Sequence, residues 1–153
     1  MTLQQFIDAR FGLFVHYGLY SLLQRGEWVW NRETISRTEY PSLATRFRAE
    51  NSDADALCRL ARDAGMKYIV LTTMHHDGFR LYPTNLSDFH IGNSAAAGRD
   101  LVAEVIENLP DFASVVFEKE RTCLSLLELR LHKGDTACPP AFYTTPGACA
   151  AMA

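Results

Sequence analysis

An apolar run ends abruptly in two histidines, an aspartate and a glycine in the stretch Lys67-Tyr-Ile-Val-Leu-Thr-Thr-Met-His-His-Asp-Gly-Phe79. Residues 67–73 carry β-branched and aromatic side chains almost without interruption, which predicts a strand buried on both faces. Asp77-Gly78 then predicts a turn. In α/β folds, ligands bind outside the carboxyl ends of parallel strands. His75 and His76 are therefore candidate binding residues.

A second buried-strand pattern covers residues 10–17 and also ends in a histidine, His16. Apolar residues recur at helical spacing over residues 53–64 and again, on a strongly amphipathic segment, over residues 99–109. The order strand, helix, strand, helix predicts right-handed βαβ units and a parallel sheet. We therefore expect an α/β fold.

The segments between these elements give weaker patterns. Residues 20–33 are rich in aromatic and charged side chains and are interrupted by a glycine, which indicates a long loop and not a core element. Residues 36–48 suit a short helix with Pro41 in its first turn. Residues 77–98 carry proline, asparagine and glycine, which predict a loop.

The pattern changes after Leu109. Another βα repeat would continue with a glycine and a buried strand, but the chain gives Pro110-Asp111, a short apolar piece at 112–117 and a charged run. The tail from 109 to 153 shows no pattern of a packed element. Two interpretations stay open for this tail: a frameshift and disorder.

Composition limits the class of protein. The chain has 153 residues, 48% hydrophobic and 22% charged, which is typical of one globular domain. A net charge of −3 without a basic run argues against nucleic-acid binding, and no apolar stretch approaches the ~20 residues of a membrane span. We expect a cytoplasmic protein, because no secretory signal is visible. The cysteines fit neither a zinc nor a disulfide pattern, and reduced thiols are expected at Cys58, Cys123, Cys138 and Cys149.

Histidines at strand ends suit two kinds of chemistry. Imidazole is a common metal ligand, and Asp77 could add a carboxylate. However, adjacent histidines are awkward joint ligands and the sequence has no His-x-His spacing, so we expect no metal and no cofactor. Imidazole also carries a donor and an acceptor on one ring, which suits recognition of a hydroxyl-rich ligand.

Glu27-Trp28 indicates the same kind of ligand. A carboxylate beside tryptophan is a candidate general acid, because apolar surroundings raise its pKa. Trp28 and Trp30 could each present a flat face to a sugar ring. The alternative is that both tryptophans belong to the core and Glu27 is solvated. Asp77, which precedes a glycine, is expected to form the turn and not to act in catalysis.

Four segments together carry a family resemblance: Arg10-Phe-Gly-Leu-Phe-Val-His-Tyr-Gly-Leu-Tyr-Ser21, Gly26-Glu-Trp-Val-Trp-Asn-Arg-Glu33, Ala64 to Phe79 and Gly98-Arg-Asp-Leu-Val102. In this order and spacing they resemble the N-terminal part of the α-L-fucosidases of glycoside hydrolase family 29, over roughly residues 8–108. The family's His-Trp-Gly is His-Tyr-Gly here.

The resemblance implies a TIM-like (β/α)-barrel, of which residues 1–108 would supply the N-terminal part, about two βα units. It implies release of terminal α-linked fucose with retention, from fucosylated glycans or glycosides. By the same resemblance, His16, His75 and His76 hold fucose hydroxyls and Trp28 lines the sugar pocket. Glu27 contacts the sugar and is the candidate acid/base.

The family's nucleophile is an aspartate on a later barrel strand, and we find no equivalent after residue 108. Retaining hydrolysis needs two carboxylates roughly 5 Å apart. We therefore expect a fucosidase fragment that is inactive alone. The alternatives are a non-catalytic fucose-binding module and a half that complements the missing remainder of the barrel.

Overall fold

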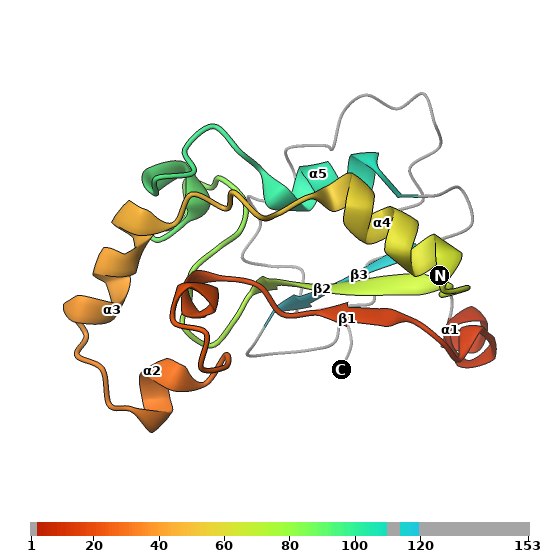
Figure 1. The fold of residues 1–153 in the computed structure, drawn as a ribbon, viewed down its shortest axis with the longest axis horizontal. Helices are drawn as coiled ribbons and strands as arrows, with labels where there is room; N and C mark the ends of the chain where they lie inside the picture. Colours follow the sequence, from red (N-terminus) through yellow and green to blue (C-terminus); the bar gives the residue numbers. More distant parts are fainter. Residues whose placement is uncertain (1–2, 110–113, 120–153) are drawn as a thin grey trace.

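The computed structural model describes residues 3–109 and 114–119. Within them, a parallel sheet has the strand order β1 (Leu13–Val15), β2 (Tyr68–Met74) and β3 (Ser114–Lys119). Figure 1 shows helices α4 and α5 on one side of this sheet, and the short helices α2 and α3 beyond the carboxyl ends of its strands. The sheet and its two covering helices confirm the predicted mixture of helices and parallel strands.

The helical elements are short apart from α4. In chain order they are α1 (Leu3–Ala9), the 3-10 helix η1 (Leu19–Leu22), α2 (Val29–Arg32), α3 (Glu39–Ser42), η2 (Leu43–Arg46), α4 (Ala54–Asp63), η3 (Ile91–Asn93) and α5 (Leu101–Glu107).

Both covering helices begin at a capping aspartate. The carboxylate of Asp53 accepts the Ala56 N–H at 2.9 Å, and that of Asp100 accepts two amides at the start of α5. After α4 the chain turns through Gly65 at φ +75°, a conformation that glycine adopts without strain. These signals explain why the helices lie at the predicted places.

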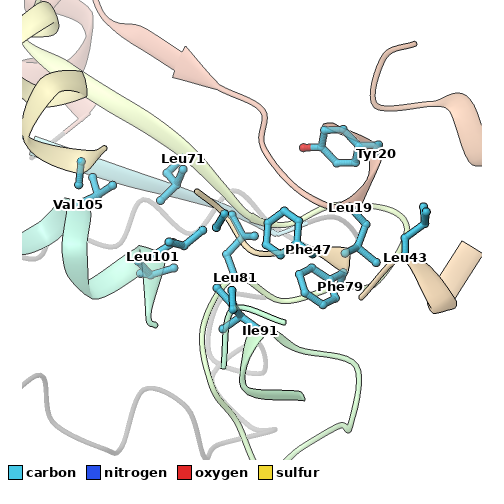
Figure 2. Packing of buried hydrophobic residues seen from close by; sticks show 14 of the residues in the cluster. Leu19, Tyr20, Leu43, Phe47, Leu71, Phe79, Leu81, Ile91, Leu101 and Val105 are labelled. Atoms are coloured by element: carbon cyan, nitrogen blue, oxygen red, sulfur yellow. The ribbon is translucent and has the colours of Figure 1, made fainter. Parts of the chain in front are cut away.

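The core extends from the sheet into the segments beyond its carboxyl edge. Figure 2 shows its members from β2, α5 and the connecting segments: Leu19, Tyr20, Leu43, Phe47, Leu71, Phe79, Leu81, Ile91, Leu101 and Val105. The interpretation of residues 20–33 as a loop outside the core is therefore wrong. Tyr20 and Val29 are buried there because η1 and α2 turn these side chains inward.

The helix expected over residues 36–48 is also wrong in its length. The segment forms two short pieces, α3 and η2, and Phe47 leaves them in an extended conformation. Pro41 is the third residue of α3 and so lies in its first turn, as expected. Burial of Tyr40 and Phe47 against the core, and not helix length, organises this segment.

The strand predicted over residues 10–17 is shorter and less buried than expected. β1 covers three residues and Phe14 remains 53% exposed. β1 pairs with β2, and within the described residues its other side has no strand. Its lone neighbour explains why only part of the apolar pattern is covered.

The apolar piece at 112–117 was not expected to continue the sheet, yet β3 pairs in parallel with β2. The sequence pattern there is too short to predict a strand, and the pairing depends on the neighbouring strand. The remainder of the tail, with three of the four cysteines, lies outside the described residues. Cys58 is a buried free thiol in α4. None of the described helices is long and apolar enough to span a bilayer.

Arg99 joins the segment before α4 to the start of α5. Its guanidinium donates to the carbonyl oxygens of Ala49 and Ser52, and its Nε donates to Glu104 Oε1 at 2.9 Å. A planar guanidinium can make all of these bonds at once, which lysine cannot. Ala49 is buried and has a φ of +54°. The contacts to Arg99 therefore hold a strained backbone in place.

We expect Arg99→Ala to lower the free energy of unfolding by about 2 kcal/mol, because three part-buried acceptors lose their charged donor. Urea unfolding followed by circular dichroism measures this. The matched control is Arg59→Ala, which removes an exposed ion pair with Asp55 and should cost less than about 0.5 kcal/mol. Equal losses in the two variants would contradict the role of Arg99.

Candidate functional site

Parallel pairing places His16 beside the end of β2. Val15 is in register with Leu71, His16 follows directly, and His75 follows the end of β2. The ring centroids of His16 and His75 lie 5.3 Å apart, edge to face. The structure thus brings together histidines that are far apart in the sequence, at the carboxyl edge of the sheet.

A tight turn lets His75 and His76 face the same region. The Gly78 N–H donates to the His75 carbonyl at 2.9 Å, and Asp77 Oδ1 accepts the Phe79 N–H at 3.0 Å. Gly78 has a φ of +80°. With the backbone turned in this way, the two imidazole centroids are 4.4 Å apart. Asp77 forms the turn, as its position before glycine predicted.

Trp28 covers the second histidine. Its indole stacks on His76 with centroids 4.0 Å apart and 12° between the planes, and it meets His75 edge to face at 5.8 Å. His76 Nε2 lies 2.9 Å from the carbonyl oxygen of Glu27. A carbonyl only accepts hydrogen bonds, so Nε2 carries a proton and donates it to the Glu27 carbonyl.

The side chains around these histidines differ in their exposure to solvent. His75 is 6% exposed and has the ring of Tyr20 at 5.3 Å, whereas His16 is exposed and Trp28 is 37% exposed. We call the side chains of His16, Glu27, Trp28, His75 and His76 the histidine cluster. It offers polar atoms beside one accessible aromatic face, which suits a small hydroxylated ligand.

The pKa of Glu27 is lowered, whereas the neighbouring tryptophan led us to expect a raised pKa. A hydrogen bond with its own backbone lowers the pKa of Glu27 most, burial acts in the opposite direction, and the charges of His16 and His75 lower the pKa further. The expectation that Trp28 would raise this pKa is therefore wrong within the described residues. The reason is that Glu27 is close to solvent and to imidazoles, so its carboxylate stays ionised and accepts hydrogen bonds.

The two tryptophans have different surroundings. Trp30 stacks on Tyr40 at 4.7 Å with 8° between the planes, and its Nε1 donates to the Ile35 carbonyl at 2.9 Å. Trp30 therefore belongs to the support of the cluster, and Trp28 alone of the pair contacts the histidines. The alternative that tryptophans here serve the core holds for Trp30.

Tyr40 lies within the segment 36–48, whose sequence pattern predicts only a short helix. In the structure its hydroxyl donates to Asp77 Oδ2 at 2.7 Å, from a fully buried position. Burial, followed by the charge of Asp77, raises the pKa of Tyr40, so the hydroxyl stays protonated. The one available signal was a tyrosine among apolar residues, since a buried hydroxyl needs a partner.

A cavity of about 170 Å³ lies between the sheet and the covering helices, but it is not the histidine cluster. Leu71, Leu101 and Val105 line it, with Ser52 and Asp53 among its polar residues. Of the cluster only His16 reaches it. The described residues contain no group of three or more His, Cys, Asp or Glu side chains placed to hold a metal ion.

Comparison with known proteins gives a consistent result. The alpha-L-fucosidase family model matches residues 1–114. Tissue alpha-L-fucosidase of Bos taurus is 34% identical over 116 residues, which cover 65% of this chain and 25% of that protein. The structure of an alpha-L-fucosidase GH29 from Bacteroides thetaiotaomicron is similar with a TM-score of 0.70 and 28% identity, over 75% of this chain and 28% of that one.

A third similar protein is alpha-L-fucosidase AlfC from Lactobacillus casei, whose structure is in complex with alpha-L-fucose product. The TM-score is 0.64 at 32% identity, over 75% of this chain and 40% of that one. The chain thus spans about a quarter of the length of the curated relative it matches. The matched residues include the whole histidine cluster.

The lowered pKa of Glu27 predicts a pH dependence. Its carboxyl should titrate at a lower pH in the folded chain than in the urea-unfolded chain, as followed by carbon chemical shifts. A group with a depressed folded pKa stabilises the fold above the unfolded pKa, and this contribution is lost as the pH falls through the folded pKa.

His16→Ala should move the folded midpoint of Glu27 upward, because it removes a positive charge that favours the carboxylate. His90→Ala is the control, since His90 caps η3 and is not part of the cluster. A folded midpoint above the unfolded one would restore the expectation of a raised pKa.

Proposed function

The chain belongs to the alpha-L-fucosidase family, and on that premise we propose that its histidine cluster binds the terminal alpha-L-fucose of a glycan or glycoside. The observation that carries the proposal is the stacked pair of Trp28 and His76 beside His75 and His16. The fucose product in the similar Lactobacillus casei protein supports the same class of ligand.

The chemistry of the cluster suits a sugar. Neutral imidazole offers one donor and one acceptor, and the ionised carboxylate of Glu27 accepts from hydroxyl groups. The exposed part of Trp28 provides an apolar face against which C–H groups of a sugar ring can pack. His16, His75 and His76 then hold hydroxyls, Trp28 lines the ring, and Glu27 contacts the sugar.

The full reaction needs a second carboxylate. A retaining glycosidase places its acid and its nucleophile roughly 5 Å apart. Asp77 lies beside the cluster, but Tyr40 and the Phe79 amide occupy its two oxygens. Glu27 could act as the acid/base only where a further group raised its pKa. We infer that the described residues bind the sugar and that the nucleophile comes from another part of a complete enzyme.

For the fold, we propose that the described strands and helices are the beginning of a TIM-like (β/α)-barrel, with residues 1–108 as its N-terminal part. The similarity to family structures and the parallel strand order support this. The expectation of a frameshifted or disordered tail from 109 to 153 concerns residues that, apart from Leu109 and β3, lie outside the described part of the chain. Cytoplasmic location remains a proposal from the sequence.

A second candidate function is complementation of a separately supplied barrel remainder. It is favoured by the side of β1 that lacks a strand within the described residues, and by Phe11 and Phe14, which are 52% and 53% exposed. A strand edge that has no neighbour within the described residues, with exposed aromatic side chains beside it, is a ready surface for another strand.

Sugar binding can be tested by tryptophan fluorescence. Titration with methyl α-L-fucoside should change the emission of the chain, and Trp28→Phe should abolish the change. Trp30→Phe is the matched control: it keeps an aromatic ring on Tyr40 and leaves Trp28 in place, so the response should persist. A flat titration of the wild-type chain to high millimolar sugar would reject the binding proposal.

Turnover is a separate prediction. The isolated 153-residue chain should release no chromophore from an aryl α-L-fucoside, because within the described residues both oxygens of Asp77, the carboxylate beside the cluster, are hydrogen-bonded. Rapid release that His75→Ala abolishes would show that the chain is a complete catalyst. Activity that returns only on co-expression with the remaining barrel of a relative would favour complementation.

A further inference from the structure

We propose that Tyr40 is a positioning residue for the histidine cluster, because its buried hydroxyl holds the turn after His76 and lies beside the segment after His16. The two segments come from different strands, and Tyr40 from neither of them. The proposal goes beyond sugar binding itself, since it concerns how the binding side chains are held.

The first contact fixes the turn. Tyr40 Oη donates to Asp77 Oδ2 at 2.7 Å, with Tyr40 fully buried and Asp77 6% exposed. The other oxygen of Asp77 accepts the Phe79 amide at 3.0 Å. The carboxylate thus receives one bond from within the turn and one from outside it. Hydrogen bonds to a buried charge are stronger than those between neutral groups, so the outside bond constrains the turn.

The second contact reaches the other histidine segment. The backbone of Tyr20 lowers the pKa of Tyr40, against the larger effects of burial and of Asp77, so it lies near the Tyr40 hydroxyl. Tyr20 lies four residues after His16 and is itself buried, and its ring meets His75 edge to face at 5.3 Å. The Tyr40 hydroxyl therefore donates to the turn that carries His75 and His76 and lies beside the segment that follows His16.

Trp30 holds the tyrosine ring in this place. The two rings stack at 4.7 Å, and the indole is tied through Nε1 to the Ile35 carbonyl at 2.9 Å. A ring fixed from behind restricts where its hydroxyl can lie, so rotation of Tyr40 cannot relieve a change at the turn. Trp30 of α2 therefore holds Tyr40, and Tyr40 in turn holds the turn that carries the histidines.

A purely structural contact would stabilise the fold and leave the cluster geometry unchanged when removed. Positioning makes a different prediction: His76 should move relative to Trp28 while the fold persists. The stacked pair reports this, because protons of an imidazole that lies on an indole face are shifted upfield by its ring current. This readout needs no sugar and is independent of the proposed function.

The experiment uses the whole chain and ring-proton NMR of histidine. Tyr40→Phe keeps the stacking on Trp30 and removes only the hydroxyl. We expect the His76 ring signals to shift downfield toward those of an unstacked imidazole. The matched control is Tyr68→Phe, at the other end of β2, where the ring packs on Phe6. It should leave the His76 signals unchanged.

Asp77→Asn provides a second variant that alters the same bond from its other partner. An amide has one acceptor oxygen in place of two, so it cannot satisfy both Tyr40 and the Phe79 amide as the carboxylate does. The His76 signals should shift in the same direction as in Tyr40→Phe. Unshifted signals in either folded variant would overturn the proposal. Unfolding of both variants would also overturn it, because the pair would then serve the fold and not the geometry.

A second measurement, of fucoside binding, rests on the proposed function. Removal of a partner that orients a binding histidine commonly weakens ligand affinity by about tenfold or more in metal sites, and we expect about tenfold weaker binding of methyl α-L-fucoside in Tyr40→Phe. If the signals shift and the wild-type chain binds no fucoside, positioning holds and sugar binding fails. If the fucoside binds equally to both chains, positioning is overturned and sugar binding stands.

Discussion

Parallel pairing of β1 with β2 is the constraint on which the site depends. Because Val15 is in register with Leu71, the residues that follow both strands emerge at the same edge of the sheet. An antiparallel pair would place His16 and His75 at opposite edges. The α4 crossover makes the parallel order possible, and its capping by Asp53 fixes where the chain turns back toward the sheet.

Local patterns predicted much of this arrangement. The run at 67–73, the helical spacings at 53–64 and 99–109, and the turn at Asp77-Gly78 each have a cause that acts within a few residues, and the structure has an element at each place. The meeting of His16 with His75 followed from strand order alone. These predictions succeed because periodicity and capping report directly on burial and chain direction.

The rest depends on contacts between distant segments. Nothing near Trp30 in the sequence indicates that it stacks on Tyr40, while Trp28, two residues earlier, stacks on His76. The pKa of Glu27 depends on its backbone hydrogen bond and on imidazoles from other segments. The raised pKa predicted from the neighbouring tryptophan is therefore wrong. β3 likewise forms because it pairs with β2, a strand far from it in the sequence.

The long separation between β1 and β2 has a consequence for the order of folding. The pairing of Leu13 with Ile69 closes a loop of more than fifty residues, whereas the turn that carries His75 and His76 closes locally. Loop-closure entropy makes the distant pairing late and slow relative to helix and turn formation. During synthesis, the segment with Phe14 and His16 therefore stays unpaired until β2 has been synthesised. The histidine cluster is then completed late in folding.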